Sequence, residues 1–393
     1  TTPDFSLTWY NPKGQTKIKY SYLMKLLNYK EGDAWNKEKI QQSLLTLRAT
    51  GVFDKINLFP SYKTSVDNQK DIIFFVKDDD PFEIKLRMGF AQVSKNFYFK
   101  KGSTYKIGGS FIWKNPTARA DRFSADFDFN RYEQKINVAY RLPLLGNIPL
   151  ATTFKGYANT YIQPIVIGSS KPLYRILQQG FLMGLSKSGQ HYDCGVTSGF
   201  EWMEINDVAL NVAQALNFET DLVDKKIPYF FIEPMIYADF LDDKINPTKG
   251  FYTSASLKGM FPFKESSYFI KCTLEQAHFI SLASSVLALR VRTGHIFRHD
   301  FRSIMPSERF FLGGPFSLRG YLQDYCPPLG TYQNDKNEIT HVPQGGKTML
   351  NGNAELRFPT YKKTLWATIF QDFGILLETP HDIFTNIQPL AAT

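Results

Sequence analysis

The stretch "FSADFDFN" at residues 123–130 decides the fold, because side chains of opposite character alternate along it. Its odd positions carry Phe or Ala, and its even positions carry Ser, Asp or Asn. Successive side chains of a β-strand point to opposite faces, so this strand would have one apolar and one polar face. Carboxylates are costly against a packed core but not against water. The pattern therefore predicts a strand between lipid and a water-filled lumen.

The same alternation extends in both directions from this strand. Residues 82–90 place five apolar side chains on one face, and residues 134–142 repeat the pattern. Loop signals such as "KNPT" at residues 114–117 separate the segments, and the period of two recurs from residue 81 onward. A soluble β-sandwich would also alternate, but a single one has about 100 residues. A membrane β-barrel is the simpler interpretation of so long a repeat.

Composition agrees with this class and argues against others. The chain has 393 residues, of which 43% are hydrophobic and 15% aromatic. It contains no run of about 18 apolar residues that could form a transmembrane helix. The net charge of +9 comes from basic residues scattered at alternate positions, which disfavours a nucleic-acid interface. Cys194, Cys272 and Cys326 show no CxxC spacing and predict no disulfide framework.

Residues 1–80 follow a different pattern, which contains helices. Apolar residues at i, i+3, i+4 and i+7 from Tyr20 predict one short helix. A second helix should begin at a cap on Asn36 and end at Gly51. Strands are expected at residues 5–10, 55–60 and 71–77, which gives the order β-α-α-β-β.

The segment "EGDAWNKEKIQQSLLTLRATGVFDKINLFP" at residues 31–60 resembles a POTRA domain. That family typically shows a Gly-Asp pair, a helix, and then a Leu, a Thr-Gly pair and a Phe that lead into a strand. The resemblance implies binding of extended client chains by addition of a strand to a sheet edge. A generic small α+β domain is the alternative. The matching residues are Gly32, Asp33, Leu47, Thr50, Gly51 and Phe53.

The most specific motif is "ERFFLGGPFSLRGY" at residues 308–321. It resembles the signature of the Omp85 superfamily, the surface antigen D15 type of outer-membrane assembly barrel, in which Gly-Gly precedes an Arg-Gly-aromatic triplet. The resemblance implies a loop that folds back into the barrel lumen with the triplet at its tip. The hairpin "NPTKGF" at residues 246–251 also looks like one common in this superfamily. The motif residues are Gly313, Gly314, Arg319, Gly320 and Tyr321.

An arginine inside a lumen needs acidic partners, because its guanidinium keeps its charge and offers five donors. At the superfamily's relative positions the chain carries Glu355, in "NGNAELRFP", and Asp372, in "FQDFG". Both would face inward if Leu356 and Phe373 face lipid. We expect Arg319 to pair with Asp372, with Glu355 nearby. The alternative is a solvated loop arginine.

These observations predict a POTRA domain at residues 1–80 and a mainly β, transmembrane antiparallel β-barrel at residues 81–393. The resemblance implies a barrel of the sixteen-stranded type, and residues 387–393 look like the start of a further strand. About three C-terminal strands would then be missing, and we expect a fragment, since an open edge in lipid leaves unpaired backbone groups. The first barrel strand would form half of a lateral gate, through Phe82, Ile84, Leu86, Met88 and Phe90.

No motif predicts an enzyme, a metal site or a cofactor. The chain has no GxSxG, Walker A or GxGxxG motif and no evident nucleophile–base pair. His295 and His299 have the spacing of a helical metal pair. On a strand, however, positions four apart lie about 13 Å from each other, which is too far to share one ion.

The resemblance implies an assembly factor of a Gram-negative outer membrane, with its POTRA domain in the periplasm. Unfolded outer-membrane proteins would be its clients, the lipid bilayer its surroundings and accessory assembly subunits its other partners. A client strand would pair with the POTRA edge, then with the first barrel strand, and pass sideways into the bilayer. A secretion pore of the same superfamily, a passive porin, and a mitochondrial or plastid outer membrane are the alternatives.

Overall fold

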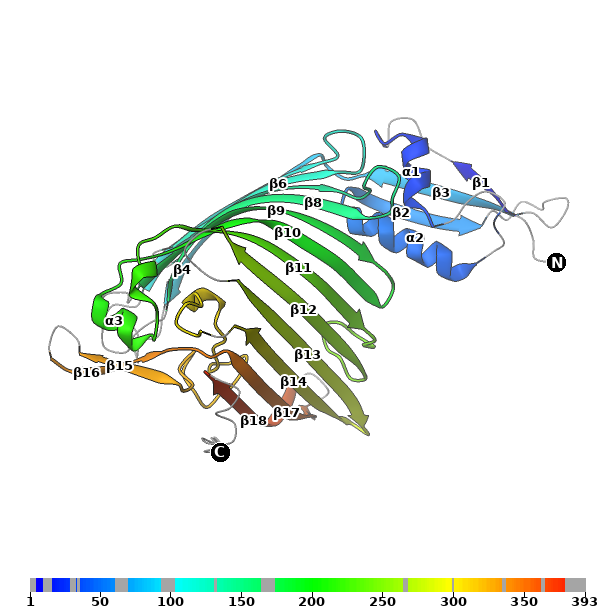
Figure 1. Cartoon of the computed structure of the whole chain (residues 1–393). Coiled ribbons are helices and arrows are strands. Elements are labelled where there is room, and N and C mark those ends of the chain that lie inside the picture. The colour runs from blue at the N-terminus through cyan, green and yellow to red at the C-terminus, as the bar shows by residue number, and fades with distance from the viewer. Residues whose placement is uncertain are drawn as a thin grey trace.

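The chain forms a small N-terminal unit and one large curved sheet in a computed structural model (Figure 1). Within the described part of the chain, no helix is long and apolar enough to span a membrane. The structure describes residues 5–9, 16–28, 33, 36–60, 70–92, 103–130, 133–163, 174–263, 268–298, 300–333, 337–361 and 365–378.

The N-terminal unit has the expected β-α-α-β-β order. Its second helix begins at Asn36, whose Oδ1 accepts from the N–H groups of Glu38 at 2.8 Å and Lys39 at 3.2 Å. It ends at Gly51, which adopts the left-handed conformation with φ of 67°. The sheet has the order β1-β3-β2, so β1 and β2 are its edges. The elements are β1 (Phe5–Trp9), α1 (Tyr20–Leu26), α2 (Lys37–Thr50), β2 (Phe53–Pro60) and β3 (Lys70–Asp78).

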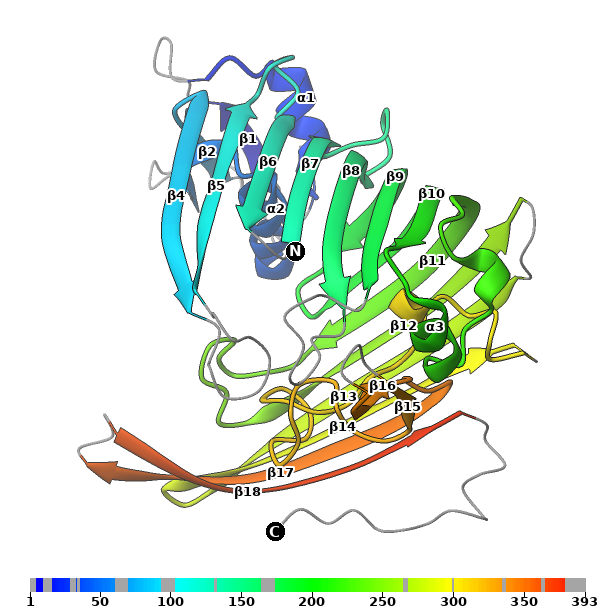
Figure 2. The ribbon, with the colours of Figure 1, turned by 90° about the vertical axis from the view of Figure 1, so that its left-hand side faces the viewer.

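Among the described residues, the large sheet contains thirteen strands, each antiparallel to its neighbours, and it curves around a concave side (Figure 2). This mainly β, antiparallel architecture confirms the predicted fold class. The strands are β4 (Phe82–Gln92), β5 (Ser103–Lys114), β6 (Arg122–Asn130), β7 (Glu133–Leu142), β8 (Ala151–Gln163), β9 (Tyr174–Ser188), β10 (Tyr192–Asn206), β11 (Ile227–Asp239), β12 (Gly250–Pro262), β13 (Phe269–Leu282), β14 (Ser285–Phe297), β17 (Thr348–Tyr361) and β18 (Leu365–Leu377).

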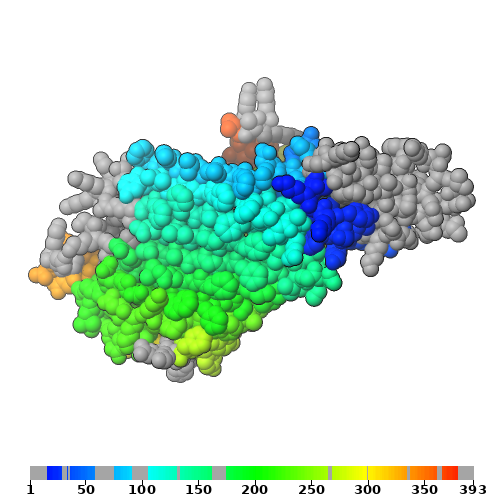
Figure 3. Space-filling view, turned by 90° about the horizontal axis from the view of Figure 1, so that it is seen from above, coloured from blue at the N-terminus to red at the C-terminus, as the bar shows by residue number. Residues whose placement is uncertain are grey.

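The two faces of the sheet differ as the alternation predicts. On the inner face, Arg87 of β4 and Asp128 of β6 form an ion pair at 3.3 Å across the intervening strand. On the outer face, the rings of Phe82, Phe111 and Phe123 follow one another with centroids 6.1 and 6.4 Å apart. Seen from above, the early strands form one continuous convex surface (Figure 3). This apolar outer face suits contact with lipid.

Two long connections fold onto the concave side. Residues 207–226 contain α3 (Leu210–Ala215) and η1 (Thr220–Leu222), and residues 298–347 contain η2 (Pro306–Glu308), β15 (Leu329–Gln333) and β16 (Ile339–Pro343). Their buried side chains, such as Phe218, Leu312 and Leu318, form one core with inner-face residues of the wall. The buried wall residues of this core lie on β9–β14, β17 and β18.

The N-terminal unit packs against the barrel turns at the end of the sheet that lies opposite to α3 (Figure 1). Ala120 and Leu144, from the turns after β5 and β7, join its buried core with Leu23 and Leu47. Lys25 Nζ also donates to Asn147 Oδ1 at 2.9 Å. The unit is therefore held against the ends of the strands by shared apolar burial.

Candidate functional site: the lumen loop and its anchors

Residues 298–347, here called the lumen loop, connect β14 to β17 and carry the motif at residues 308–321. The Gly313 N–H donates to Ser317 Oγ at 2.9 Å, and the Gly314 N–H donates to the Tyr321 carbonyl at 2.9 Å. Gly313 has a φ of +119°, and a Cβ there would lie 2.1 Å from the Leu322 carbonyl oxygen. The glycine pair therefore lets the chain double back on itself.

This turn brings Arg319 to Asp372 on β18. Arg319 Nε donates to Asp372 Oδ2 at 2.8 Å and Nη2 donates to Oδ1 at 2.6 Å, which is the bidentate fork of a strong arginine–carboxylate pair. The main-chain N–H of Arg319 also donates to Oδ2 at 3.0 Å. Asn353 Nδ2 adds a fourth donor to the same carboxylate, at 2.7 Å from Oδ1. The Asp372 side chain is 5% exposed, so these donors replace its water.

Glu355 contacts the other side of the same guanidinium. Its Oε1 lies 2.8 Å from Arg319 Nη1, while its Oε2 accepts from Arg357 Nη2 at 2.7 Å. Arg319 Cζ lies 3.5 Å from the centre of the Phe370 ring, so the guanidinium also stacks on an aromatic face. The structure thus brings together Arg319 and the two carboxylates singled out in the sequence. Gly320 is exposed, and Tyr321 packs against the lumen core.

The orientation of the two wall strands explains this arrangement. Asn353 pairs with Asp372 and Glu355 with Phe370 in the antiparallel register, so these side chains share the inner face. Leu356 and Phe373 alternate with them and are partly exposed on the outer face. A lumen cavity of about 270 Å³ remains beside Arg319 and Glu355.

A second anchor, at the base of the loop, was missed by sequence reasoning. Glu308 Oε1 lies 2.6 Å from Lys258 Nζ, on β12. Lys271 Nζ, on β13, donates to the Glu308 carbonyl oxygen at 2.7 Å and lies 3.5 Å from Oε2. The only sequence signal was alternation, which places both lysines on inner faces, and they are direct partners in the register. Without the register, the sequence could not show that both lysines contact Glu308.

Arg309 forms a third anchor, to main-chain oxygens. Its guanidinium is buried, and its Cζ lies 4.0 Å from the Phe301 ring centre. Because two of the acceptors belong to residues 207–226, this side chain joins the two long connections. Its acceptors are the carbonyl oxygens of Leu216, Asn217, Phe301, Ile304 and Gln344.

Comparison with known proteins identifies the family. Residues 115–386 match the Omp85 superfamily domain. The chain belongs to the Omp85 superfamily. Residues 9–78 match a surface antigen variable number repeat, the POTRA family. Members of the Omp85 superfamily are outer-membrane proteins of bacteria and mitochondria that act in protein insertion or secretion.

Individual relatives are distant from this chain. A SAM50-like protein of Schizosaccharomyces pombe is 22% identical over 304 residues, which cover 74% of this chain and 59% of that protein. The chain thus spans less than two thirds of the length of this curated relative. The crystal structure of BamA from Haemophilus ducreyi lacking POTRA domains 1–3 aligns with a TM-score of 0.70 at 15% identity, over 99% of this chain and 75% of that one. CdiB from Escherichia coli aligns with a TM-score of 0.58 at 14% identity, over 96% and 67%.

The first strand of this Omp85 sheet, β4, lies at one edge and pairs with β5. Its outer residues are the most exposed apolar row of the described barrel wall. Their exposed fractions rise from 55% for Phe82 to 91% for Phe90. Ile84, Leu86 and Met88 lie between these values. The strand β4 therefore combines an exposed row of apolar side chains with a position at the edge of the sheet.

Histidines do not form a metal site in the described part of the Omp85 barrel. His295 Nδ1 lies 2.8 Å from Thr348 Oγ1, and His299 lies outside the described residues. Among the residues that the structure describes, no group of three His, Cys, Asp or Glu side chains could hold a metal ion. Residues 387–393, where a further strand was expected, also lie outside the described residues.

Proposed function

We propose that this protein inserts client β-strands into an outer membrane, and that β4 is the strand on which a client pairs. The observation that carries the proposal is the direct connection between a POTRA sheet and the edge of the barrel sheet. Residues 79–81 alone separate β3 from β4. Lys114 supports this link, because its Nζ lies 2.6 Å from Asp79 Oδ2 and 3.0 Å from Glu83 Oε2.

The proposed path uses two sheet edges in turn. An extended client first adds to an edge of the POTRA sheet through main-chain hydrogen bonds, as in other cases of β-augmentation. It then pairs with β4, whose exposed apolar row faces lipid, so that the apolar side chains of the client strand enter the bilayer beside it. We propose a Gram-negative outer membrane, with a mitochondrial or plastid membrane as the alternative.

A secretion pore is the second candidate, since it would share the POTRA domain and the lumen loop. A chain passing through the lumen would have to displace the loop, which is held by Arg319, Glu308 and Arg309 and buries a shared core. A sideways path past β4 leaves these contacts in place. The anchored loop therefore favours insertion over secretion, and over a passive porin for small solutes.

The test compares client folding and client contact in liposomes that contain the full-length protein. The intact protein should accelerate folding of an unfolded β-barrel client, and the Arg319→Ala and Asp372→Ala variants should do so several-fold less. A Met88→Cys variant, with Cys194, Cys272 and Cys326 changed to Ser, should cross-link to the client, and Phe181→Cys in the middle of the wall should not. Ion conductance without acceleration of folding, or equal cross-linking at both positions, would refute insertion at β4. Conductance that Arg319→Ala leaves unchanged would favour a passive porin.

A further inference from the structure

The edge strand β4 has one gap in its lumen-facing row of side chains, at Gly89. Arg87 and Gly89 lie on the same face, and the ion pair of Arg87 with Asp128 places that face towards the lumen. Apart from its chain neighbours, a Cβ on Gly89 would meet no atom within 4 Å. Gly89 pairs with Lys106 of β5 on one side, and its other side is the edge of the described sheet. The glycine therefore leaves open space where a further strand would add.

At three places in the wall, an aromatic ring from the neighbouring strand covers such a glycine. In each case the ring belongs to the residue directly opposite the glycine in the antiparallel register. In the first two of these pairs, a Cβ on the glycine would lie 2.7 Å from a ring atom, so the ring occupies the volume that the missing side chain leaves. The pairs are Gly109 with Phe127, Gly180 with Tyr157, and Gly352 with Phe373.

Of these three rings, Tyr157 lies on the lumen side and shows which side chain suits Gly89. Lys155 Nζ lies 5.5 Å from the centre of the Tyr157 ring. Gly89 has similar surroundings, because Arg87 precedes it by two residues and Lys106 lies opposite it. Cations are attracted to an aromatic face, and a tyrosine keeps its hydroxyl in the water of the lumen. The lumen side of β4 therefore suits a tyrosine better than an aliphatic side chain.

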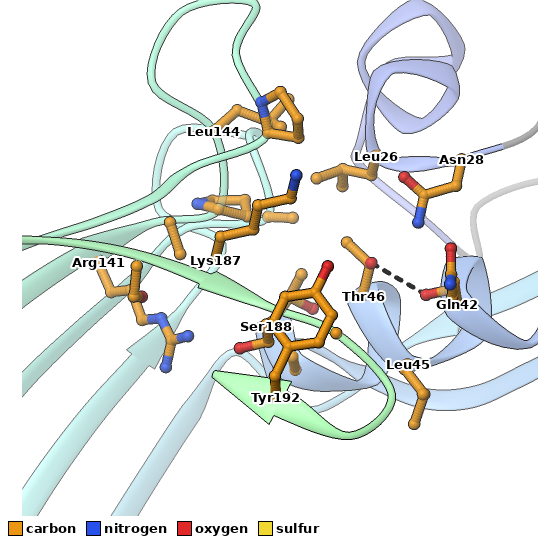
Figure 4. Close-up of a pocket in the computed structure, with 18 residues that line it drawn as sticks. Leu26, Asn28, Gln42, Leu45, Thr46, Arg141, Leu144, Lys187, Ser188 and Tyr192 are labelled. Carbon is orange, nitrogen blue, oxygen red and sulfur yellow. Dashed lines mark hydrogen bonds between the residues drawn. The ribbon is translucent and has the colours of Figure 1, made fainter. Parts of the chain in front are cut away.

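The other features of β4 do not fix the register of an added strand. Main-chain hydrogen bonds repeat every two residues, and the outer row of residues 82–90 is apolar throughout. A hollow of about 230 Å³ lies at the junction with the N-terminal unit, between Leu45 of α2 and Tyr192 of β10 (Figure 4). It marks no position along β4, because none of its lining residues lies on that strand. Gly89 is the one position among residues 82–90 without a side chain, so a ring that fills it would set the register.

We propose that Gly89 selects and aligns the client, and that the client strand on β4 places a tyrosine over Gly89 on the lumen side. Residues directly opposite each other in paired strands share a face, so the ring would lie as Tyr157 lies over Gly180. The side chains next to this tyrosine would point to lipid, beside Met88 and Phe90. This inference rests on the proposed pairing of a client with β4, and it names the kind of strand that pairs best.

The experiment moves an inward-facing tyrosine along the terminal strand of a β-barrel client in steps of two residues, which keeps it on one face. The full-length protein in liposomes carries Met88→Cys, with Cys194, Cys272 and Cys326 changed to Ser. Each client carries one cysteine, either directly after the tyrosine or at a fixed position. In an antiparallel pairing, the residue after the tyrosine lies opposite position 88. Disulfide formation should therefore follow the tyrosine as it moves and should be lost from the fixed position.

Replacing the client tyrosine with serine should lower the yield of the disulfide about threefold to fivefold, because a cross-strand pair contributes up to about 1 kcal/mol. Gly89→Val fills the gap and should remove the preference for tyrosine. Gly156→Val is the matched control and should leave the preference unchanged. A Cβ on Gly156 also meets no atom within 4 Å, but this glycine faces lipid on β8, away from the edge. Heat-modifiable mobility on gels verifies that each variant is folded.

The outcomes separate this inference from the proposed function. Cross-linking at position 88 that ignores the tyrosine, or that keeps the same preference in Gly89→Val, would overturn the role of Gly89 and leave insertion at β4 in place. The absence of cross-linking with every client would refute pairing at β4, whether the edge is free or closed by another strand of this chain. The inference about Gly89 would then fail with it.

Discussion

Replacing Asp372 with Asn tests the main anchor of the lumen loop with the least change in shape. The carboxylate accepts from the Arg319 main-chain N–H, from Nε and Nη2 of the same residue, and from Asn353. An amide has one oxygen and would turn its own N–H donors towards one of these groups. Asp372→Asn therefore removes the charge and at least one arm of the bidentate contact.

The magnitude follows from the contacts. A hydrogen bond to a charged group contributes about 1.5–3 kcal/mol, and two of them join the guanidinium to Asp372. In this variant, Arg319 would keep its contact with Glu355. The Arg319 side chain is 23% exposed, so water replaces part of the lost hydrogen bonding. We therefore expect the free energy of loop opening to fall by about 2–4 kcal/mol, which raises the open population about 30- to 1000-fold. Glu355→Gln weakens the single contact of that side chain with Arg319 and should lower the free energy of loop opening by about 1 kcal/mol.

Hydrogen–deuterium exchange of the folded barrel in detergent measures this opening directly. Peptides that cover residues 313–322 should lose protection in the order Asp372→Asn, then Glu355→Gln, then the intact protein. Peptides from β12 and β13 should not change, because their ladder hydrogen bonds do not involve this carboxylate. Asp242→Asn, in the turn between β11 and β12, is the matched control. Unchanged loop protection in Asp372→Asn, or a larger effect of Glu355→Gln, would refute the assignment of Asp372 as the main anchor.

Further predictions concern the second anchor, the loop packing, the POTRA helix and one turn. Glu308→Gln leaves Lys258 and Lys271 without their counter-charge and should destabilise the barrel by about 2–4 kcal/mol in thermal unfolding. If the double variant with Lys258→Met recovers none of this lost stability, the broken ion pair is not its cause. A Cβ on Gly294 would lie 2.4 Å from Phe310 Cζ, so Gly294→Val should cost about 1–3 kcal/mol in the same assay, and the outward Val291→Ile should cost less. Asn36→Ala removes the cap of α2 and should lower its stability by about 1 kcal/mol in amide exchange, whereas an equal effect of Lys37→Ala would contradict capping. Donation from Thr248 Oγ1 and three main-chain N–H groups lowers the pKa of Asp242 to about 2. Since this folded pKa lies below the unfolded value of about 3.9, the carboxylate stabilises the turn above about pH 4 and stops doing so as the pH falls through 2. Amide protection at Thr248 should follow this window, and an identical pH dependence in Asp242→Asn would contradict it.

Local regularity explains how much of the fold the sequence could predict. The segments 123–130 and 134–142 were expected as strands, and β6 and β7 each extend them by one residue. A period of two needs no knowledge of distant residues, because side chains of a strand alternate whatever it pairs with. The same holds for α2, whose cap at Asn36 and end at Gly51 are encoded within the helix itself.

Contacts that depend on register or on main-chain atoms could not be predicted in this way. Lys258 and Lys271 contact Glu308 because β12 and β13 pair at that position and the loop passes over them. Arg309 binds carbonyl oxygens, which every residue carries, so no residue type marks its partners. Arg319 was singled out because its motif and the two carboxylates occur in a recognisable order. Its role in function stays a prediction.

The distribution of buried contacts gives the wall two mechanically different halves. The lumen core packs on β9–β14, β17 and β18, where Met349 is 1% exposed. At the other end, no described residue of β4 belongs to this core, and β4 is joined to the sheet through its ladder with β5 and through side-chain pairs such as Arg87 with Asp128. A client strand that adds to the edge of β4 breaks no hydrogen bond of the β4–β5 ladder. Separating two strands behind the loop would break a ladder and expose a packed core, which no incoming strand restores. If the sheet opens during insertion, it should therefore open at β4, with the anchors of Arg319 and Glu308 intact on the far side.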